Sequence, residues 1–394
     1  MNPPSIPEIT PPELALKIES GETLQIVDVR PASSVSAGRI EIDQKDRFHN
    51  IPGSILLSHF SLDGTVIDLD APTVVVCAHG NDSRVVTDHL RRLGVDAQSL
   101  AGGMSAWMKL LVPRMLEPPA SSDILTQFDR LGKGALSYVL VSAGEAIIID
   151  PSRNVRTYVD WIEKADARPV AVADTHVHAD YISGGPAISR EYGIPYYLHP
   201  ADAIYPYDGT PGRLDISPVH DGMAIKVGRC SISVRTTPGH SPGSVTYFVG
   251  EDAAFTGDFL FLLSVGRPDL AGKTEAWAPL LWESIQRVTS TWPPHLMIYP
   301  AHYSGQENRL ANHAVGASLE EVLRHNASLR KMSEPEFLNW VKQMDFPFPG
   351  AYRTIKAINI GLSRVGDLEA DDLEIGKNEC ALGGRRTSNS SDPL

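Results

Sequence analysis

Short apolar runs separated by turn residues mark the first hundred residues of the chain. Residues 24–30 are mainly apolar, and residues 72–76 include three successive valines. Apolar side chains at positions 85, 86, 90 and 93 have the spacing of one helix face. Residues 51–57 predict a turn that leads into a further strand. Strands that alternate with helices predict an α/β domain with a parallel sheet.

A second pattern begins near residue 136. Residues 136–141 and 145–150 are apolar runs on either side of Ala143-Gly144, which indicates a hairpin. Residues 187–192 predict a short helix, and residues 224–236 alternate apolar and polar positions as a half-buried strand does. These elements predict a second domain of mixed strands and helices.

Length and composition narrow the class of protein. The chain has 394 residues, which favours two domains, and no apolar stretch is long enough to cross a bilayer. A net charge of −13 argues against nucleic acid, because phosphate binding needs a basic face. We expect neither a nucleic-acid nor a membrane partner. Three widely spaced cysteines and a start without a secretory pattern predict a reducing cytoplasm. A homodimer is left open.

Composition also suggests the domain boundaries. We expect a first domain at residues 6–117, and the proline-rich segment 114–123 as a linker. A second domain is expected at residues 122–365, and an acidic, then polar, tail at 366–394 is expected to be disordered. Cys380 lies in that tail, whereas Cys230, inside the alternating strand, is expected to be buried and inert.

A cluster of polar side chains follows the apolar run 169–173. His176 and His178 are two residues apart, so on an extended segment their imidazoles leave the same side. Asp180 adds an oxygen ligand two residues further on. Closely spaced donors at the end of a strand are typical of a metal site, although the same histidines in a polar loop would merely form hydrogen bonds. Three further candidates follow in loops: His240 in a PGHSPGS segment, Asp258 after TG, and His302 in YPAH.

This ordered set resembles the metallo-β-lactamase superfamily, which implies an αββα sandwich over residues 124–364. The usual hydrolase pattern HxHxDH ends here in Tyr181, which leaves the second metal site poorly furnished. Two histidines and one carboxylate suit non-haem Fe(II) and leave positions open. The set is similar to the persulfide dioxygenases, which implies one Fe(II) per chain, with Zn as the alternative. The implied iron ligands are His176, His240 and Asp258, and the supporting or remnant second-site residues are His178, Asp180, Tyr181 and His302.

In the first domain, Cys77 follows the valine run and precedes a helix. Amide N–H groups and the helix end there favour the thiolate, although a buried, inert cysteine is the alternative. The segments VDVR, IPGS, CAHGNDSR and LAGGMSAW resemble the rhodanese domain, which implies that Cys77 carries sulfane sulfur beside Arg84. Ser34 and Asp82 differ from the usual pattern, and Asp82 predicts weak binding of an anionic donor such as thiosulfate.

Two residues beyond the metal loops are candidates for substrate binding. The resemblance implies that Arg267 helps to bind glutathione, with a salt bridge to Asp269 as the alternative. Tyr303, after the last histidine, is a further candidate, although the usual Asp before it is missing. The expected reaction is oxidation of glutathione persulfide, or a similar thiol persulfide, by O2 to sulfite and thiol, coupled to sulfur transfer from a sulfane-sulfur donor.

Two other functions remain open. A thioester hydrolase like glyoxalase II would use two metals to activate water, and Tyr181 counts against it. A non-catalytic sulfur carrier or metal sensor would turn over at neither site.

Overall fold

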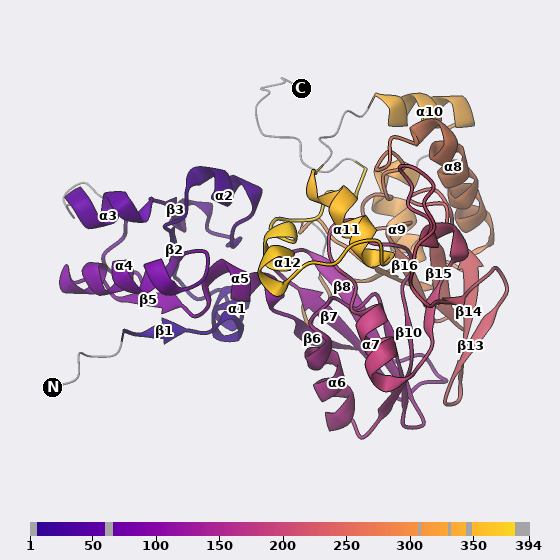
Figure 1. Ribbon diagram of the computed structural model, residues 1–394, viewed down its shortest axis with the longest axis horizontal. Helices are drawn as coiled ribbons and strands as arrows, with labels where there is room; N and C mark the ends of the chain where they lie inside the picture. The colour runs from indigo at the N-terminus through magenta and orange to yellow at the C-terminus, as the bar shows by residue number, and fades with distance from the viewer. Residues whose placement is uncertain (1–5, 60–65, 306–308, 330–331, 344–348, 383–394) are drawn as a thin grey trace. The chain divides into compact units, whose positions relative to one another are not determined.

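A computed structural model describes residues 6–59, 66–305, 309–329, 332–343 and 349–382 (Figure 1). The chain divides into two compact units. The first comprises residues 1–112, 130–133 and 375–377, and the second comprises residues 113–129, 134–374 and 378–394. The domain boundaries expected from composition stay predictions.

The first unit contains a five-stranded sheet with the order β1-β5-β4-β2-β3, and every pair is parallel. This confirms the parallel α/β fold, and apolar side chains cover both faces of the sheet. Its strands are β1 (Glu8–Ile9), β2 (Gln25–Asp28), β3 (Phe48–Asn50), β4 (Thr73–Val76) and β5 (Ala97–Leu100), and its helices are α1 (Pro11–Glu19), α2 (Ala32–Ala37), α3 (Gly53–His59), α4 (Asn81–Arg92) and α5 (Gly103–Lys109).

The strand predicted within residues 51–57 is wrong, because this segment forms helix α3. Leu56 is fully buried, whereas its neighbours Ile55 and Leu57 are about half exposed. One buried position flanked by exposed ones fits a short helix that touches the core along one edge. Three consecutive apolar residues do not distinguish this arrangement from a strand.

The second unit packs two sheets face to face around one large apolar core. The first sheet has the order β12-β11-β10-β9-β8-β7-β6, and the second has the order β13-β14-β15-β16-β17-β18. Helices α6 and α7 pack on β10, and α9 packs on β17, so helices cover both outer faces (Figure 1). This confirms the αββα sandwich. Its strands are β6 (Val112–Leu116), β7 (Ile124–Arg130), β8 (Ala135–Ser142), β9 (Glu145–Ile149), β10 (Arg168–Ala173), β11 (Tyr196–Leu198), β12 (Ser217–Pro218), β13 (Ala224–Val227), β14 (Cys230–Thr236), β15 (Val245–Val249), β16 (Ala253–Gly257), β17 (Met297–Pro300) and β18 (Ala317–Ser318), and its helices are α6 (Val155–Lys164), α7 (Gly185–Tyr192), α8 (Thr274–Thr291), α9 (Leu319–His325), α10 (Glu334–Lys342), α11 (Ala351–Asn359) and α12 (Asp367–Leu373).

The candidate ligands follow the ends of four strands of the sandwich. His176 and His178 come after β10, His240 after β14, Asp258 directly after β16, and His302 after β17. Gly257 has a φ of +57°, and a Cβ there would lie 2.3 Å from the Thr175 hydroxyl. Glycine is therefore required where the chain leaves β16 and turns Asp258 toward the other ligands.

The prediction of a disordered tail from residue 366 is wrong for residues 366–382. Helix α12 occupies part of this segment, and Arg153 forms ion pairs with Asp371 and Glu374. Further on, Ala381 forms a β-bridge with Gly266, and Cys380 is fully buried. The acidic residues that led us to expect disorder thus include two carboxylates that form ion pairs with Arg153 of the sandwich. The polar stretch after residue 382 lies outside the described residues.

Among the described residues, no helix combines the length and the apolar character that crossing a membrane requires.

Candidate metal centre and sulfurtransferase loop

His176, His240 and Asp258 converge on one buried point. One ligand atom from each lies within 4.8 Å of the other two. Asp258 Oδ2 is 3.5 Å from His176 Nε2 and 3.6 Å from His240 Nε2. All three atoms are buried, and none has a hydrogen-bond partner among the described residues. Buried polar atoms without partners are costly, so three that face one point fit a metal ion.

The fold fixes the ring orientation of both histidines. Thr175 Oγ1 donates to the Asp150 carboxylate, so it accepts from His176 Nδ1, 3.1 Å away. His240 Nδ1 donates in the same way to the main-chain oxygen of Arg267, at 3.0 Å. Each Nδ1 therefore carries the proton, and each Nε2 presents a lone pair to the shared point, which is the tautomer that binds a metal.

Electrostatics favour the same ligand forms. Burial holds the pKa of His240 well below its usual value, and burial together with His178 lowers the pKa of His176. Burial alone would raise the pKa of Asp258, but His302 and His176 hold it well below its usual range. The site thus offers two neutral imidazoles and one carboxylate, which is the donor set of a facial triad.

His302 contacts the carboxylates of Asp258 and Asp180 and does not face the point shared by the three candidate ligands. Its Nδ1 is 2.6 Å from Asp258 Oδ1, and its Nε2 is 3.0 Å from Asp180 Oδ2. Burial would lower the pKa of His302, but Asp180 and Asp258 raise it to about 10. With one oxygen of Asp258 held by His302, the other is left for a metal.

His178 and Tyr181 form a pair beside the triad. The Tyr181 hydroxyl is 2.9 Å from His178 Nε2, which also lies 3.1 Å from Asp150 Oδ1. His178 Nδ1 is buried and has no hydrogen-bond partner among the described residues. His178 therefore keeps one nitrogen that a metal could use, and its expected supporting role stays a prediction.

Cys380 borders the site, which the sequence did not indicate. Its thiol belongs to a buried group with Asp180 and His302, whose ligand atoms lie within 4.8 Å of one another. Burial raises the pKa of Cys380 well above its usual value, which favours the neutral thiol. Its main-chain oxygen accepts from Arg267 N at 2.9 Å. Only the return of residues 378–382 to the sandwich brings this cysteine to the site, and no motif marks that return.

The geometry of Arg267 favours the salt-bridge alternative over substrate binding. Its guanidinium is 1% exposed and forms a two-pronged pair with Asp269, with Nε–Oδ1 and Nη2–Oδ2 distances of 2.7 and 2.5 Å. A third nitrogen, Nη1, donates to the Glu379 main-chain oxygen at 3.3 Å. Arg267 thus ties the returning segment to the loop that supports His240.

Tyr303 likewise contacts residues that are not candidate metal ligands. Its hydroxyl donates to Asp129 Oδ1 at 2.7 Å, and the Arg309 guanidinium lies over its ring at 4.6 Å. These contacts leave the proposed substrate role of Tyr303 as a prediction without support from the geometry.

In the first unit, Cys77 lies at the end of β4, before α4. The Gly80 amide donates to its sulfur at 3.0 Å, and the Ser83 hydroxyl is 3.2 Å from it. Gly80 has a φ of +90°, and a Cβ there would lie 2.8 Å from the Gly102 nitrogen, so this loop requires glycine. The loop thus places one amide donor and one hydroxyl beside the sulfur, which suits a carrier of sulfane sulfur.

The described contact of Arg84 does not involve Cys77. Arg84 is about half exposed on α4, and its Nη1 lies 3.7 Å from Glu8 Oε1. Asp82 is exposed in the first turn of the same helix. The cation expected beside the sulfur is therefore paired with an acidic residue in this structure, and its catalytic role stays a prediction.

Family models match both units of the chain. Residues 10–110 match the rhodanese-like domain, and residues 131–309 match the metallo-beta-lactamase superfamily. A solved metallo-beta-lactamase from Staphylococcus aureus shares the fold, with a TM-score of 0.55 and 24% identity over 64% of this chain and 74% of that one. The fold and the site thus define a metallo-β-lactamase-type protein with a rhodanese-like domain ahead of it.

Curated relatives narrow the family. The chain is 29% identical to the human mitochondrial persulfide dioxygenase, over 65% of this chain and 92% of that protein. It is 30% identical to the Bos taurus persulfide dioxygenase, over 53% and 79%, and 29% identical to a probable metallo-hydrolase of Bacillus subtilis, over 43% and 84%. The chain belongs to the metallo-β-lactamase superfamily and, within it, to the family of the persulfide dioxygenases.

Proposed function

We propose that this protein is an Fe(II)-dependent persulfide dioxygenase that oxidises glutathione persulfide, or a similar low-molecular-weight persulfide. The observation that carries the proposal is the convergence of His176 Nε2, His240 Nε2 and Asp258 Oδ2 on one buried point. A donor set of two histidines and one carboxylate suits Fe(II) and leaves coordination positions for other ligands. The relationship to persulfide dioxygenases supports the same reaction.

The proposed reaction converts RSSH, O2 and H2O into RSH, sulfite and two protons. Both atoms of O2 are reduced by the terminal sulfur, so no separate reductant is needed. Iron, when bound, would supply the activation of oxygen. The protein orients the ligand atoms through Thr175 and the main chain at Arg267, and His302 holds Asp258 in its ionised form.

We further propose that Cys77 supplies sulfur to this reaction. Attack of the Cys77 sulfur on the outer sulfur of a donor such as thiosulfate would break the donor's S–S bond, release sulfite and leave a persulfide on Cys77. Attack of a thiol on the outer sulfur of that persulfide would then release RSSH and the free cysteine. The Gly80 amide and the Ser83 hydroxyl next to the sulfur support this role, because both can stabilise a sulfur anion. A reducing compartment such as the cytoplasm, which we expect, would keep the three free cysteines reduced.

The test compares two substrates with the same iron-loaded protein. Glutathione persulfide should support oxygen uptake with one sulfite formed per O2. An acylglutathione thioester should release no thiol above background. Thioester hydrolysis without persulfide-dependent oxygen uptake would replace this proposal with a glyoxalase II-like hydrolase, and turnover of neither substrate would favour a carrier or sensor.

A further inference from the structure

The loop that follows β10 carries three residues of the candidate metal centre on irregular backbone. His176, His178 and Asp180 lie between the end of β10 and the start of α7, and every residue from 174 to 181 is buried. A buried main-chain group outside a helix or sheet needs another hydrogen-bond partner, because an unpaired one is costly. The side chains that supply these partners therefore help to fix where the three residues lie.

Asn359, at the end of α11, holds this loop at three main-chain groups. Its Nδ2 donates to the main-chain oxygens of His178 and Tyr181, at 2.9 and 2.8 Å. Its Oδ1 accepts from the Ser183 main-chain amide at 2.9 Å. Both sides of the side-chain amide are used, so its orientation is fixed. The two bonded carbonyls flank Asp180, and Asn359 thus holds the chain on both sides of that carboxylate.

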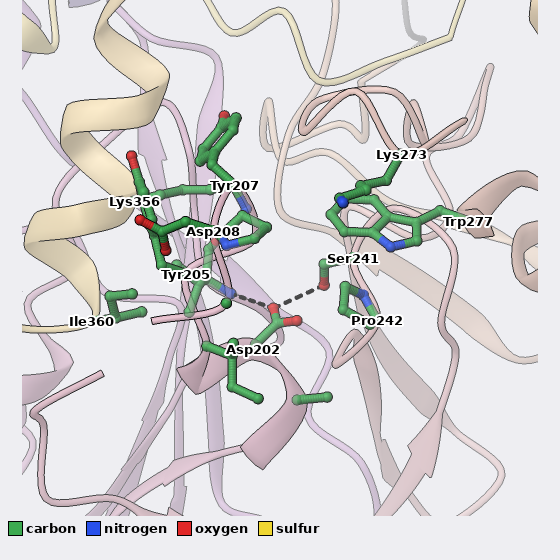
Figure 2. A pocket seen from close by; sticks show the side chains of 15 residues that line it. Asp202, Tyr205, Tyr207, Asp208, Ser241, Pro242, Lys273, Trp277, Lys356 and Ile360 are labelled. Atoms are coloured by element: carbon green, nitrogen blue, oxygen red, sulfur yellow. Dashed lines mark hydrogen bonds between the residues drawn. The ribbon is translucent and has the colours of Figure 1, made fainter. Parts of the chain in front are cut away.

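Lys356, one turn earlier on the same face of α11, holds the Val177 peptide between the two histidines after β10. Its Nζ donates to the Val177 main-chain oxygen at 3.0 Å. The Val177 amide donates to Asp202 Oδ2 at 2.8 Å. Figure 2 shows Lys356 near Asp202, which also accepts from Ser241 Oγ at 2.8 Å. Because Ser241 follows His240, these buried groups connect the two loops that carry the candidate histidines.

Neither of these α11 residues is of a type that commonly fills a protein interior. Lys356 and Asn359 are each 3% exposed, and the other buried side chains of α11 include Tyr352 and Ile355. Apolar side chains would pack the helix at these two positions without buried polar atoms. Two polar side chains that together bond four main-chain groups of one loop indicate a role at that loop.

We propose that Asn359 and Lys356 are positioning residues of the iron centre. They fix the main-chain path of residues 177–183 and, through it, the placement of His176 and Asp180. The inference rests on the proposed function, because it takes iron to bind at the point shared by the three candidate ligands. Without these hydrogen bonds the loop should shift and bind the metal roughly 10- to 100-fold more weakly, as happens when groups that orient metal ligands are lost.

The test measures Fe(II) binding to the full chain under anaerobic conditions, by competition with a chromophoric chelator. The visible spectrum of the Co(II)-loaded protein serves as a second measurement, because its bands depend on coordination geometry. Asn359→Asp keeps the shape and the acceptor for Ser183 but cannot donate to the two carbonyls. It should raise the Kd for Fe(II) roughly 10-fold or more and shift the Co(II) bands.

Asn326 provides a matched control within the same unit. It is also 3% exposed, its Nδ2 donates to the main-chain oxygens of Phe261 and Ser264 at 3.1 and 2.8 Å, and its Oδ1 accepts from the Ser328 amide at 3.0 Å. The carbonyls that it bonds lie in a loop without candidate metal ligands. Asn326→Asp should lower the melting temperature, as Asn359→Asp does, but leave the Fe(II) Kd and the Co(II) bands unchanged. Equal changes in both variants, or none in Asn359→Asp, would overturn the proposal.

Lys356 keeps the test decisive even if Asn359→Asp does not fold. Lys356→Met removes the donor to Val177 and should raise the Kd for Fe(II) roughly 10-fold. Lys356→Arg, which can still donate, should restore much of the affinity. Equal Kd values for Lys356→Met and the unaltered protein would overturn the proposal. If the variants lost iron affinity as expected while the unaltered protein took up no oxygen with glutathione persulfide, the dioxygenase proposal would fail and the positioning role would stand.

Discussion

The ring of Tyr181 stacks on the ring of His178, and the Tyr181 hydroxyl also forms a hydrogen bond with His178. The two rings lie 4.3 Å apart at an interplanar angle of 25°, and the Tyr181 hydroxyl is 2.9 Å from His178 Nε2 while it donates to the Asp150 main-chain oxygen. Burial raises the pKa of Tyr181 well above its usual value, so the hydroxyl stays protonated. The residue that breaks the HxHxDH pattern is therefore placed to form a hydrogen bond with His178, and we expect it not to bind a metal.

This arrangement predicts about one tightly held iron per chain. Tyr181→His would replace the phenol with an imidazole beside Asp180, so a second metal should bind. Oxygen uptake on glutathione persulfide should not rise, because the triad is unchanged. Metal analysis of the anaerobically purified variant and of the unaltered protein measures both counts. An unchanged metal count in the variant would mean that Tyr181 is not what limits the second site.

The triad and its neighbours should respond differently to substitution. His240→Ala removes one of the three proposed iron ligands and should abolish both iron retention and oxygen uptake. His178→Ala should weaken iron binding roughly 10- to 100-fold and leave measurable activity, as the loss of a supporting residue does. Iron titration with an activity assay separates the two variants. Because His178 Nδ1 is buried without a partner among the described residues, complete iron loss in both variants would identify His178 as a direct ligand.

Arg267 should act on stability rather than on carrier binding. Arg267→Met breaks the two-pronged pair with Asp269 and the bond to the Glu379 oxygen, and should lower the free energy of unfolding by about 1–3 kcal/mol. Its effect on the Kd for S-methylglutathione, an analogue of the proposed carrier that bears no persulfide, should stay below about twofold when binding is measured by calorimetry. A large rise in Kd with unchanged stability would restore Arg267 as a substrate contact.

The two domains should be linked through Cys77. With thiosulfate and glutathione supplied together, Cys77→Ser should abolish oxygen uptake, because serine cannot carry sulfane sulfur. Uptake on preformed glutathione persulfide should stay nearly intact. If coupled uptake persisted in Cys77→Ser, the first domain would not feed the second.

Asp82 should limit the coupled rate, because its carboxylate repels an anionic sulfur donor from the Cys77 loop. Asp82→Arg should therefore raise coupled oxygen uptake from thiosulfate and leave uptake on preformed glutathione persulfide unchanged. An equal change in both rates would point to an effect outside the first domain.

The pattern of apolar and polar residues predicted the strands and helices well where these are regular and buried. The apolar runs at 24–30 and 72–76 correspond to β2 and β4, and the ligand motifs lie at strand ends as the spacing indicated. The convergence of His176, His240 and Asp258 was predictable because each of them belongs to a short motif, and their role as iron ligands stays a prediction. The approach of Cys380 was not predictable, since long-range packing alone brings it near the site, and the sequence offered the pairing of Arg267 with Asp269 only as an alternative to substrate binding.

Metal analysis and oxygen uptake should be measured on one preparation, purified anaerobically under reducing conditions and loaded with increasing amounts of Fe(II). A mononuclear iron centre predicts saturation near one iron per chain, with oxygen uptake on glutathione persulfide that rises in proportion to bound iron. Two tightly held zinc ions per chain, with oxygen uptake that does not depend on iron, would contradict it.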